Sequence, residues 1–306
     1  MGFAITDIKG VIPAMITTFD KDEKVDLGRA EKLTEFLIGE GVNGLYITGS
    51  TGEGFLMTGE ERKAYAERVV KTAAGRVPVI VHVGDIGTRK SVELAEHAES
   101  IGADAISSVP PFYYHFSADD IYSYYSDISS SVSIPMVVYN ISLAGLMDSS
   151  LVRRLASIPG VRGLKFTSRE HDDMCALKME LGKDFMIYSG CDEMATQGLL
   201  AGADGIIGSF YNMLPDTFLR IYELARKGDY TGAFEVQKTA TTVIKYLVKW
   251  DFFPIMKALM TDAGIDAGYS RRPFHLPDAA TMAEIRAFCA DMKKKHPDIP
   301  MRYLGA

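Results

Sequence analysis

The sequence predicts an α/β protein in which eight parallel strands and their helices form a (β/α)₈ TIM barrel, followed by a C-terminal helical extension. Glycine-marked junctions recur after helix-like stretches, and each leads into a short apolar run, as expected where a helix ends and a strand begins. Eight apolar runs occupy about 210 residues, and amphipathic stretches separate nearly all of them. This alternation is typical of a closed parallel barrel.

The eight apolar runs are the predicted strands. They lie at residues 10–17, 44–48, 77–83, 104–109, 135–139, 162–166, 185–189 and 204–208. The glycine junctions begin at Gly41, Gly102, Gly160 and Gly202. A doubly wound open sheet is the alternative, but no glycine fingerprint for a dinucleotide follows the first run. We therefore expect a closed barrel.

The pattern changes after Ser209, and residues 215–294 are predicted to be helical, with breaks at Gly228, Gly264 and Pro273. We assign residues 1–225 to a barrel catalytic domain and residues 226–306 to a helical extension packed on it. No linker rich in proline or serine separates the two parts, so we expect one compact unit.

Composition restricts the class of partner. The chain has 306 residues and a net charge of −7, which disfavours nucleic acid or an anionic membrane as the main partner. We expect a small-molecule enzyme without a membrane segment. The three cysteines are widely spaced and form no metal-finger pattern, so we expect reduced thiols, a cytoplasmic location and no metal or other cofactor.

Lys165 is the first candidate for chemistry. It ends a short apolar run that follows the Pro159-Gly160 turn. A lysine ammonium that loses water has a lowered pKa, so more free amine exists at neutral pH to attack a carbonyl. The alternative is a lysine whose stem lies along apolar surface while its ammonium reaches water.

Other strand ends carry residues that suit a lysine nucleophile, because the active site of such a barrel lies at the C-terminal ends of its strands. Tyr139 ends the fifth run and is a candidate proton relay, although tyrosine is also common in cores. The loop from Gly49 to Gly54, which contains Ser50 and Thr51, can approach an anion closely, or it can be a plain tight turn.

The seventh and eighth strand ends add further candidates. Asp192 and Glu193 can accept hydrogen bonds from substrate hydroxyls, and they can also cap a helix. The glycine-rich segment 202–209 is a possible phosphate site, with close helix–strand packing as the alternative. The group from His171 to Asp173 is interpreted as the solvated face of a helix rather than as metal ligands.

Taken together, these motifs resemble the pyruvate-dependent class I aldolases typified by dihydrodipicolinate synthase and N-acetylneuraminate lyase. The resemblance runs from about Lys9 to Pro273. It is carried by four motifs in order at successive strand ends: Gly49-Ser50-Thr51-Gly52-Glu53, Tyr139-Asn140, Gly163-Leu164-Lys165, and the run from Gly202 to Ser209.

The resemblance implies roles for these residues. Pyruvate would form an imine with Lys165, Tyr139 would relay protons, and Ser50 and Thr51 would bind the pyruvate carboxylate. A homotetramer is also implied, in which Tyr113, or failing that Tyr114, reaches the relay of a neighbouring subunit.

The segment from Tyr188 to Glu193 is similar to the lyase branch of the family. That similarity implies that Thr167, Gly190, Asp192, Glu193 and Ser209 hold the hydroxyl tail of a sugar acid. The synthase branch usually has an arginine a few residues after the strand-five tyrosine, whereas residues 141–145 contain none. Ser142 also departs from the lyase pattern, which has proline at that position and a slightly longer loop.

The resemblance thus implies a lyase that cleaves a 2-keto-3-deoxy sugar acid, N-acetylneuraminate foremost, to pyruvate and N-acetylmannosamine. The alternatives are a condensing enzyme similar to dihydrodipicolinate synthase, another 2-keto-3-deoxy acid aldolase, and a barrel that binds a ligand without turnover.

Overall fold

The computed structural model describes residues 2–305 and confirms the eight-stranded parallel barrel. Neighbouring strands are hydrogen-bonded in the order β1-β8-β7-β6-β5-β4-β3-β2. A parallel bridge between Ala14 and Tyr46 then brings the two ends of the sheet together. The strands are β1 (Gly10–Pro13), β2 (Leu45–Ile47), β3 (Val79–His82), β4 (Ala105–Ser108), β5 (Met136–Ile141), β6 (Val161–Thr167), β7 (Met186–Ser189) and β8 (Gly205–Gly208).

Most strands end within one residue of the predicted position, but β1 and β5 end two or more residues away from it. β1 was expected to reach residue 17 but ends at Pro13, and Ala14 makes only a single bridge before the chain leaves the sheet. β5 runs two residues beyond Tyr139, because Ile141 still pairs with Thr167 of the long strand β6. The extra pairing places Tyr139 and Lys165 inside the ladder rather than at its last rung.

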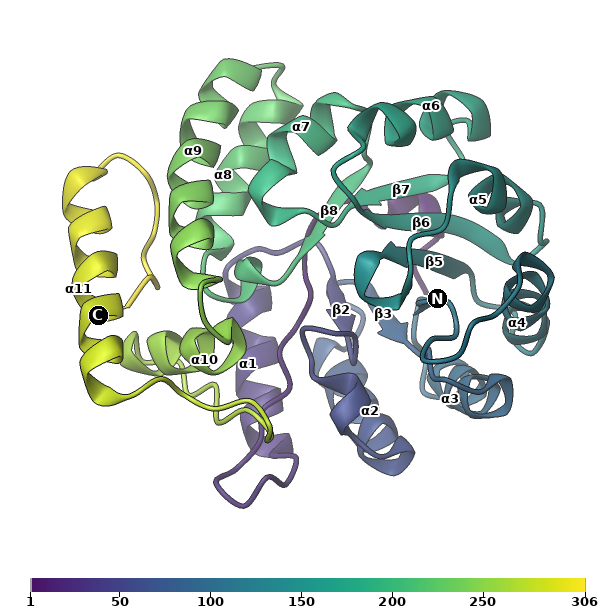
Figure 1. Cartoon of the computed structure of the whole chain (residues 1–306), viewed down its shortest axis with the longest axis horizontal. Helices are drawn as coiled ribbons and strands as arrows, with labels where there is room; N and C mark the ends of the chain where they lie inside the picture. Colours follow the sequence, from purple (N-terminus) through teal and green to yellow (C-terminus); the bar gives the residue numbers. More distant parts are fainter. Residues whose placement is uncertain (1, 306) are drawn as a thin grey trace.

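A helix follows each strand and covers the outside of the barrel (Figure 1). These helices are α1 (Leu27–Gly39), α2 (Gly59–Ala73), α3 (Thr88–Ser100), α4 (Ala118–Ser130), α5 (Ser149–Ala156), α6 (His171–Leu181), α7 (Ala195–Leu200) and α8 (Pro215–Arg226). The barrel boundary proposed at residue 225 falls in the last turn of α8.

Within residues 2–305 the chain after α8 is helical, as predicted, and contains α9 (Tyr230–Leu247), α10 (Phe252–Asp262) and α11 (Ala279–Lys295). The break between α9 and α10, at residues 248–251, was not predicted. In Figure 1, α11 lies at the edge of the molecule, on the far side of α9 and α10 from the barrel. Gly228 and Gly264 follow the ends of α8 and α10 with φ values of +80° and +87°, which glycine adopts readily. Within residues 2–305, no helix is long and apolar enough to cross a membrane.

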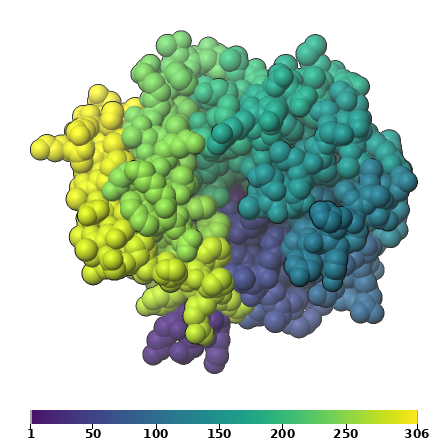
Figure 2. All heavy atoms as spheres, in the orientation of Figure 1, coloured from purple at the N-terminus to yellow at the C-terminus, as the bar shows by residue number. Residues whose placement is uncertain are grey.

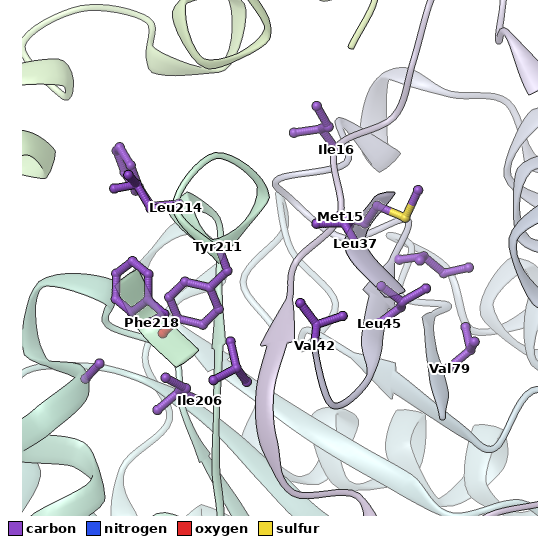
Figure 3. Close-up of a cluster of buried hydrophobic side chains, with 14 of the residues drawn as sticks. Met15, Ile16, Leu37, Val42, Leu45, Val79, Ile206, Tyr211, Leu214 and Phe218 are labelled. Carbon is purple, nitrogen blue, oxygen red and sulfur yellow. The ribbon is translucent and has the colours of Figure 1, made fainter. Parts of the chain in front are cut away.

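The apolar core has two parts, because successive side chains of a strand point to opposite faces. Val137, Tyr139, Met186 and Tyr188 belong to the cluster inside the barrel, while Leu164 belongs to the cluster between the strands and the helices. Figure 3 shows part of that outer cluster, where Ile206 of β8 lies near Tyr211 and Phe218. Since Leu164 and Phe166 both pack outward, Lys165 between them points into the barrel.

Candidate active site

Lys165 lies at the centre of the candidate site. Its backbone pairs with Tyr139 of β5 on one side and with Tyr188 of β7 on the other. The residue is only 3% exposed, so the alternative of an ammonium that reaches water is wrong. Its Nζ lies 4.0 Å from the centre of the Tyr139 ring and 4.3 Å from that of Tyr46. The amine is thus enclosed by two aromatic rings.

This environment changes the acidity of the amine. Burial lowers the pKa of Lys165 from 10.5 to about 7, against the opposing charges of Asp192 and Cys191. A much larger fraction of this lysine therefore carries a free amine at neutral pH than in an exposed lysine. Burial also raises the pKa of the Tyr139 phenol above its ordinary value of 10, so this group rests in the protonated form.

The loop between β2 and α2 closes as the tight turn that the sequence allowed. Glu53 N donates to Ser50 O at 3.0 Å, and Gly54 N donates to Gly49 O at 3.1 Å. The Thr51 hydroxyl is 2.7 Å from that of Ser209, which follows β8. Two of the predicted substrate-binding hydroxyls, from opposite ends of the barrel sequence, therefore lie together.

The end of β7 brings a second group of predicted residues next to the lysine. Gly190 N donates to Phe166 O at 2.8 Å, and a Cβ added to Gly190 would overlap the Thr167 hydroxyl and lie 3.4 Å from Lys165 Cε. A side chain at position 190 would therefore require Thr167 to move. The Thr167 hydroxyl is buried and has no hydrogen-bond partner among residues 2–305, so it can accept one from outside the chain.

Asp192 and Glu193 have different environments. Asp192 is 6% exposed, its Oδ2 accepts from Phe210 N at 2.8 Å, and burial raises its pKa to about 7. Glu193 is more accessible, and its carboxylate lies 3.9 Å from Lys245 Nζ. Both residues form the first turn of a short 3-10 helix from Asp192 to Met194, but neither side chain caps α7, whose N-cap is Met194 with no side-chain hydrogen bond.

A hollow is visible on the face of the molecule in Figure 2, between the teal segments and the green C-terminal helices. A cavity of about 270 Å³ extends from Ser50 and Ile141 to Phe253 and Phe274. Leu143, in the segment after Tyr139, also lines it. The wall beyond Ser50 is thus mainly apolar.

Tyr113 lies apart from this cluster in the single chain. Its side chain is 83% exposed, its φ is +80°, and its ring packs edge-on against Tyr114 at 5.1 Å between centroids. His171 to Asp173 begin α6 with no more than partial burial, and no group of three potential metal ligands occurs within residues 2–305. Asp172 and Asp173 are exposed, as the interpretation of a solvated face expects, whereas His171 Nε2 is buried.

Sequence reasoning missed two aromatic residues of the site. The Tyr46 ring lies against the Lys165 ammonium and explains Gly49, because a Cβ on Gly49 would lie 2.7 Å from that ring. His82 ends β3, 6.2 Å from the Tyr139 ring, and burial holds its pKa well below the usual 6.5. Tyr46 falls inside an apolar run, where a tyrosine gives no signal distinct from that of a core residue.

Comparison with known proteins shows the family to which the chain belongs. Residues 7–289 match the dihydrodipicolinate synthetase family. The N-acetylneuraminate lyase of Rhizobium meliloti is 35% identical over 281 residues, which cover 91% of this chain and 93% of the relative. That of Citrobacter koseri is 36% identical over 293 residues, with coverage of 94% and 98%.

Solved structures of named aldolases and lyases also resemble this chain over nearly its whole length. The sialic acid aldolase of Ruminococcus gnavus superposes with a TM-score of 0.89 at 33% identity, covering 94% of this chain and 99% of that one. The N-acetylneuraminate lyase of Mycoplasma synoviae gives a TM-score of 0.87 at 31% identity, again with coverage of 94% and 99%.

Proposed function

Because this chain belongs to the dihydrodipicolinate synthetase family, as its sequence motifs indicated, we propose that it is a class I aldolase that cleaves N-acetylneuraminate to pyruvate and N-acetylmannosamine. The observation that carries the chemistry is the buried Lys165 amine, whose pKa is near 7 and which lies against Tyr139. The named relatives favour the sugar acid as substrate.

The reaction begins at the C2 carbonyl of the open-chain sugar acid. The free amine of Lys165 attacks this carbon to form a carbinolamine. Tyr139, protonated at rest, donates its proton to the departing hydroxyl, which leaves as water, and a protonated imine remains. The phenolate then accepts the proton of the C4 hydroxyl. The C3–C4 bond breaks, its electron pair moves toward the imine nitrogen, and the aldehyde is released from an enamine.

The enamine is the product half that stays on the enzyme. Tyr139 returns its proton to C3, which regenerates the imine of pyruvate, and water then hydrolyses that imine to release pyruvate and the Lys165 amine. Each proton that Tyr139 gives is recovered in the following step. One phenol placed against one lysine can therefore serve the whole cycle.

Binding roles follow from the same geometry. Ser50 and Thr51 are proposed to hold the carboxylate next to C2, with Ser209 fixing the Thr51 hydroxyl through their 2.7 Å contact. Thr167, Gly190, Asp192 and Glu193 are proposed to bind the hydroxyl tail, together with Ser209. The unpartnered Thr167 hydroxyl supports this assignment, since a buried polar group without a partner is costly.

Two alternatives use the same lysine. Condensation of pyruvate with an aldehyde, as in dihydrodipicolinate synthase, is disfavoured because residues 141–145 offer no arginine to bind a second carboxylate. Cleavage of another 2-keto-3-deoxy acid is the second alternative. Ser142, which replaces the proline of the lyase pattern, leaves this alternative open. A barrel without turnover would require a defect among Lys165, Tyr139, Ser50 and Thr51, and all four are present.

We also propose a cytoplasmic homotetramer in which Tyr113 contributes to the proton relay of a neighbouring subunit. The exposed Tyr113 and Tyr114 rings and the family resemblance support this assembly. The three free cysteines support a reducing compartment.

The proposed activity is tested by incubating the protein with N-acetylneuraminate and measuring release of pyruvate and N-acetylmannosamine. We expect turnover by the wild type and none by Lys165→Met. Lys178→Met is the matched control, because Lys178 pairs with Asp204 just before β8 and should leave turnover unchanged. Cleavage by Lys165→Met would refute the mechanism, and a pyruvate adduct without sugar-acid cleavage would instead favour another aldehyde.

A further inference from the structure

The segment from Thr48 to Gly54, here called the carboxylate loop, has an unusual backbone. Thr48 and Glu53 have φ values of +58° and +52°, a left-handed conformation that side chains other than glycine rarely adopt. Such residues persist where the surrounding structure holds them in place, and they concentrate at functional sites. Glu53 N also closes the turn onto Ser50 O. The conformation of Glu53 is therefore coupled directly to the position of Ser50.

A buried lysine from the C-terminal helices holds Glu53. Lys257 of α10 is 1% exposed, and its Nζ lies 2.6 Å from Glu53 Oε1. The same Nζ lies 2.7 Å from both Thr17 O and Tyr269 O. All three N–H donors of the ammonium thus have acceptors. Burial lowers the pKa of Lys257 to about 8, against the charge of Glu53, so the group is mainly protonated at pH 7.

The other Glu53 oxygen is also held by the C-terminal region. Glu53 Oε2 accepts from Arg271 N at 2.8 Å. The Arg271 guanidinium in turn contacts Glu61, at the start of α2, with an Nη1–Oε2 distance of 2.8 Å. The carboxylate loop therefore lies between two anchors, both from residues beyond the barrel.

We propose that Lys257 and Glu53 are positioning residues whose ion pair fixes the carboxylate loop so that the Ser50 and Thr51 hydroxyls meet the carboxylate of pyruvate. This inference rests on the proposed function. It assigns the C-terminal helices a part in substrate binding rather than in folding alone. An ion pair that only stabilised the fold would leave pyruvate binding unchanged in the protein that remains folded.

The test measures how borohydride trapping of the pyruvate adduct depends on pyruvate concentration. It yields a half-saturating concentration, which depends on carboxylate binding, and a limiting rate, which depends on the Lys165 amine. For K257M and E53Q we expect the half-saturating concentration to rise about tenfold, as is typical when a buried charged partner is lost. The limiting rate should stay within about twofold of wild type, because neither residue touches Lys165.

K178M is the matched control. Lys178 also pairs with a carboxylate, the partly buried Asp204, at 2.7 Å and with a backbone carbonyl, Phe185 O, at 2.9 Å. That pair precedes β8, at the opposite end of the barrel from the carboxylate loop. K178M should therefore lower stability without raising the half-saturating concentration.

The outcomes separate the two proposals. An absence of any adduct on wild-type Lys165 would overturn the proposed function itself. A normal wild-type adduct, with folded K257M and E53Q that saturate at the wild-type pyruvate concentration, would overturn only the positioning role. If neither single variant folds, the double variant K257M/E53Q, which leaves no unpaired charge, decides between the same two results.

Discussion

Replacement of Lys165 by methionine should stabilise the protein, and the gain should depend on pH. The Lys165 pKa falls from 10.5 to about 7 in the folded state, a difference of about 5 kcal/mol at 1.36 kcal/mol per pH unit. The unfolded chain therefore binds this proton more tightly than the folded chain. Between pH 7 and pH 10.5, wild-type stability rises with pH as this unfavourable contribution is lost.

The size of the effect follows from these two pKa values. At pH 7 the buried lysine lowers the free energy of unfolding by about 4 kcal/mol relative to a side chain that does not titrate. At pH 9 it lowers that free energy by about 2 kcal/mol. Methionine removes this cost, so its advantage over wild type should shrink by about 2 kcal/mol between the two pH values. Loss of the Lys165 ammonium also raises the Asp192 pKa further. This destabilises the variant more at pH 9 than at pH 7, so it also reduces the advantage of the variant at pH 9.

The assay is urea unfolding of wild type and Lys165→Met at pH 7 and pH 9, at one protein concentration because assembly can contribute to stability. Differences in packing between lysine and methionine are the same at both pH values and cancel in the comparison. A stability difference that does not change with pH would show that Lys165 keeps an ordinary pKa in the folded protein, and it would refute the reasoning.

Three further changes test other parts of the site. Tyr139→Phe should lower kcat about a hundredfold or more while the Lys165 adduct still forms slowly, as shown by trapping and steady-state kinetics; an unchanged kcat would exclude the relay. Gly190→Ala should impair sugar-acid cleavage, because its Cβ would overlap the Thr167 hydroxyl, and wild-type kinetics would contradict that contact. Tyr113→Phe should lower turnover more than its matched control Tyr114→Phe, whereas equal activities would remove the inter-subunit relay.

The sequence was a good guide to the fold because nearly all strand residues of this barrel are buried, with Arg162 of β6 exposed. A buried strand gives a nearly continuous apolar run in the sequence. Each of the eight predicted runs contains a strand. The end of β1 was predicted too late, since the apolar residues after Pro13 continue into a loop that is also buried. Hydrophobic residues indicate burial, and after Pro13 the buried residues continue beyond the end of the strand.

The candidate site was predicted at most strand ends, although His82 at the end of β3 was missed, and the sequence has no signal for contacts that join distant segments. Lys165, Tyr139 and Thr51 could be found because the fold places the ends of successive strands together. Glu53 and Lys257 are 204 positions apart, and nothing in either local segment marks the other as its partner. Such pairs follow from the packing of the C-terminal helices on the barrel, which one sequence does not specify locally.

The central claim is that Lys165 forms an imine with pyruvate. It is tested most directly by treating the protein with pyruvate and borohydride, digesting it, and locating the modified peptide by mass spectrometry. We expect a reduced pyruvate adduct on Lys165 and none on Lys257, which is equally buried but has its three donors occupied. An unmodified Lys165, or an adduct confined to other lysines, would contradict the account.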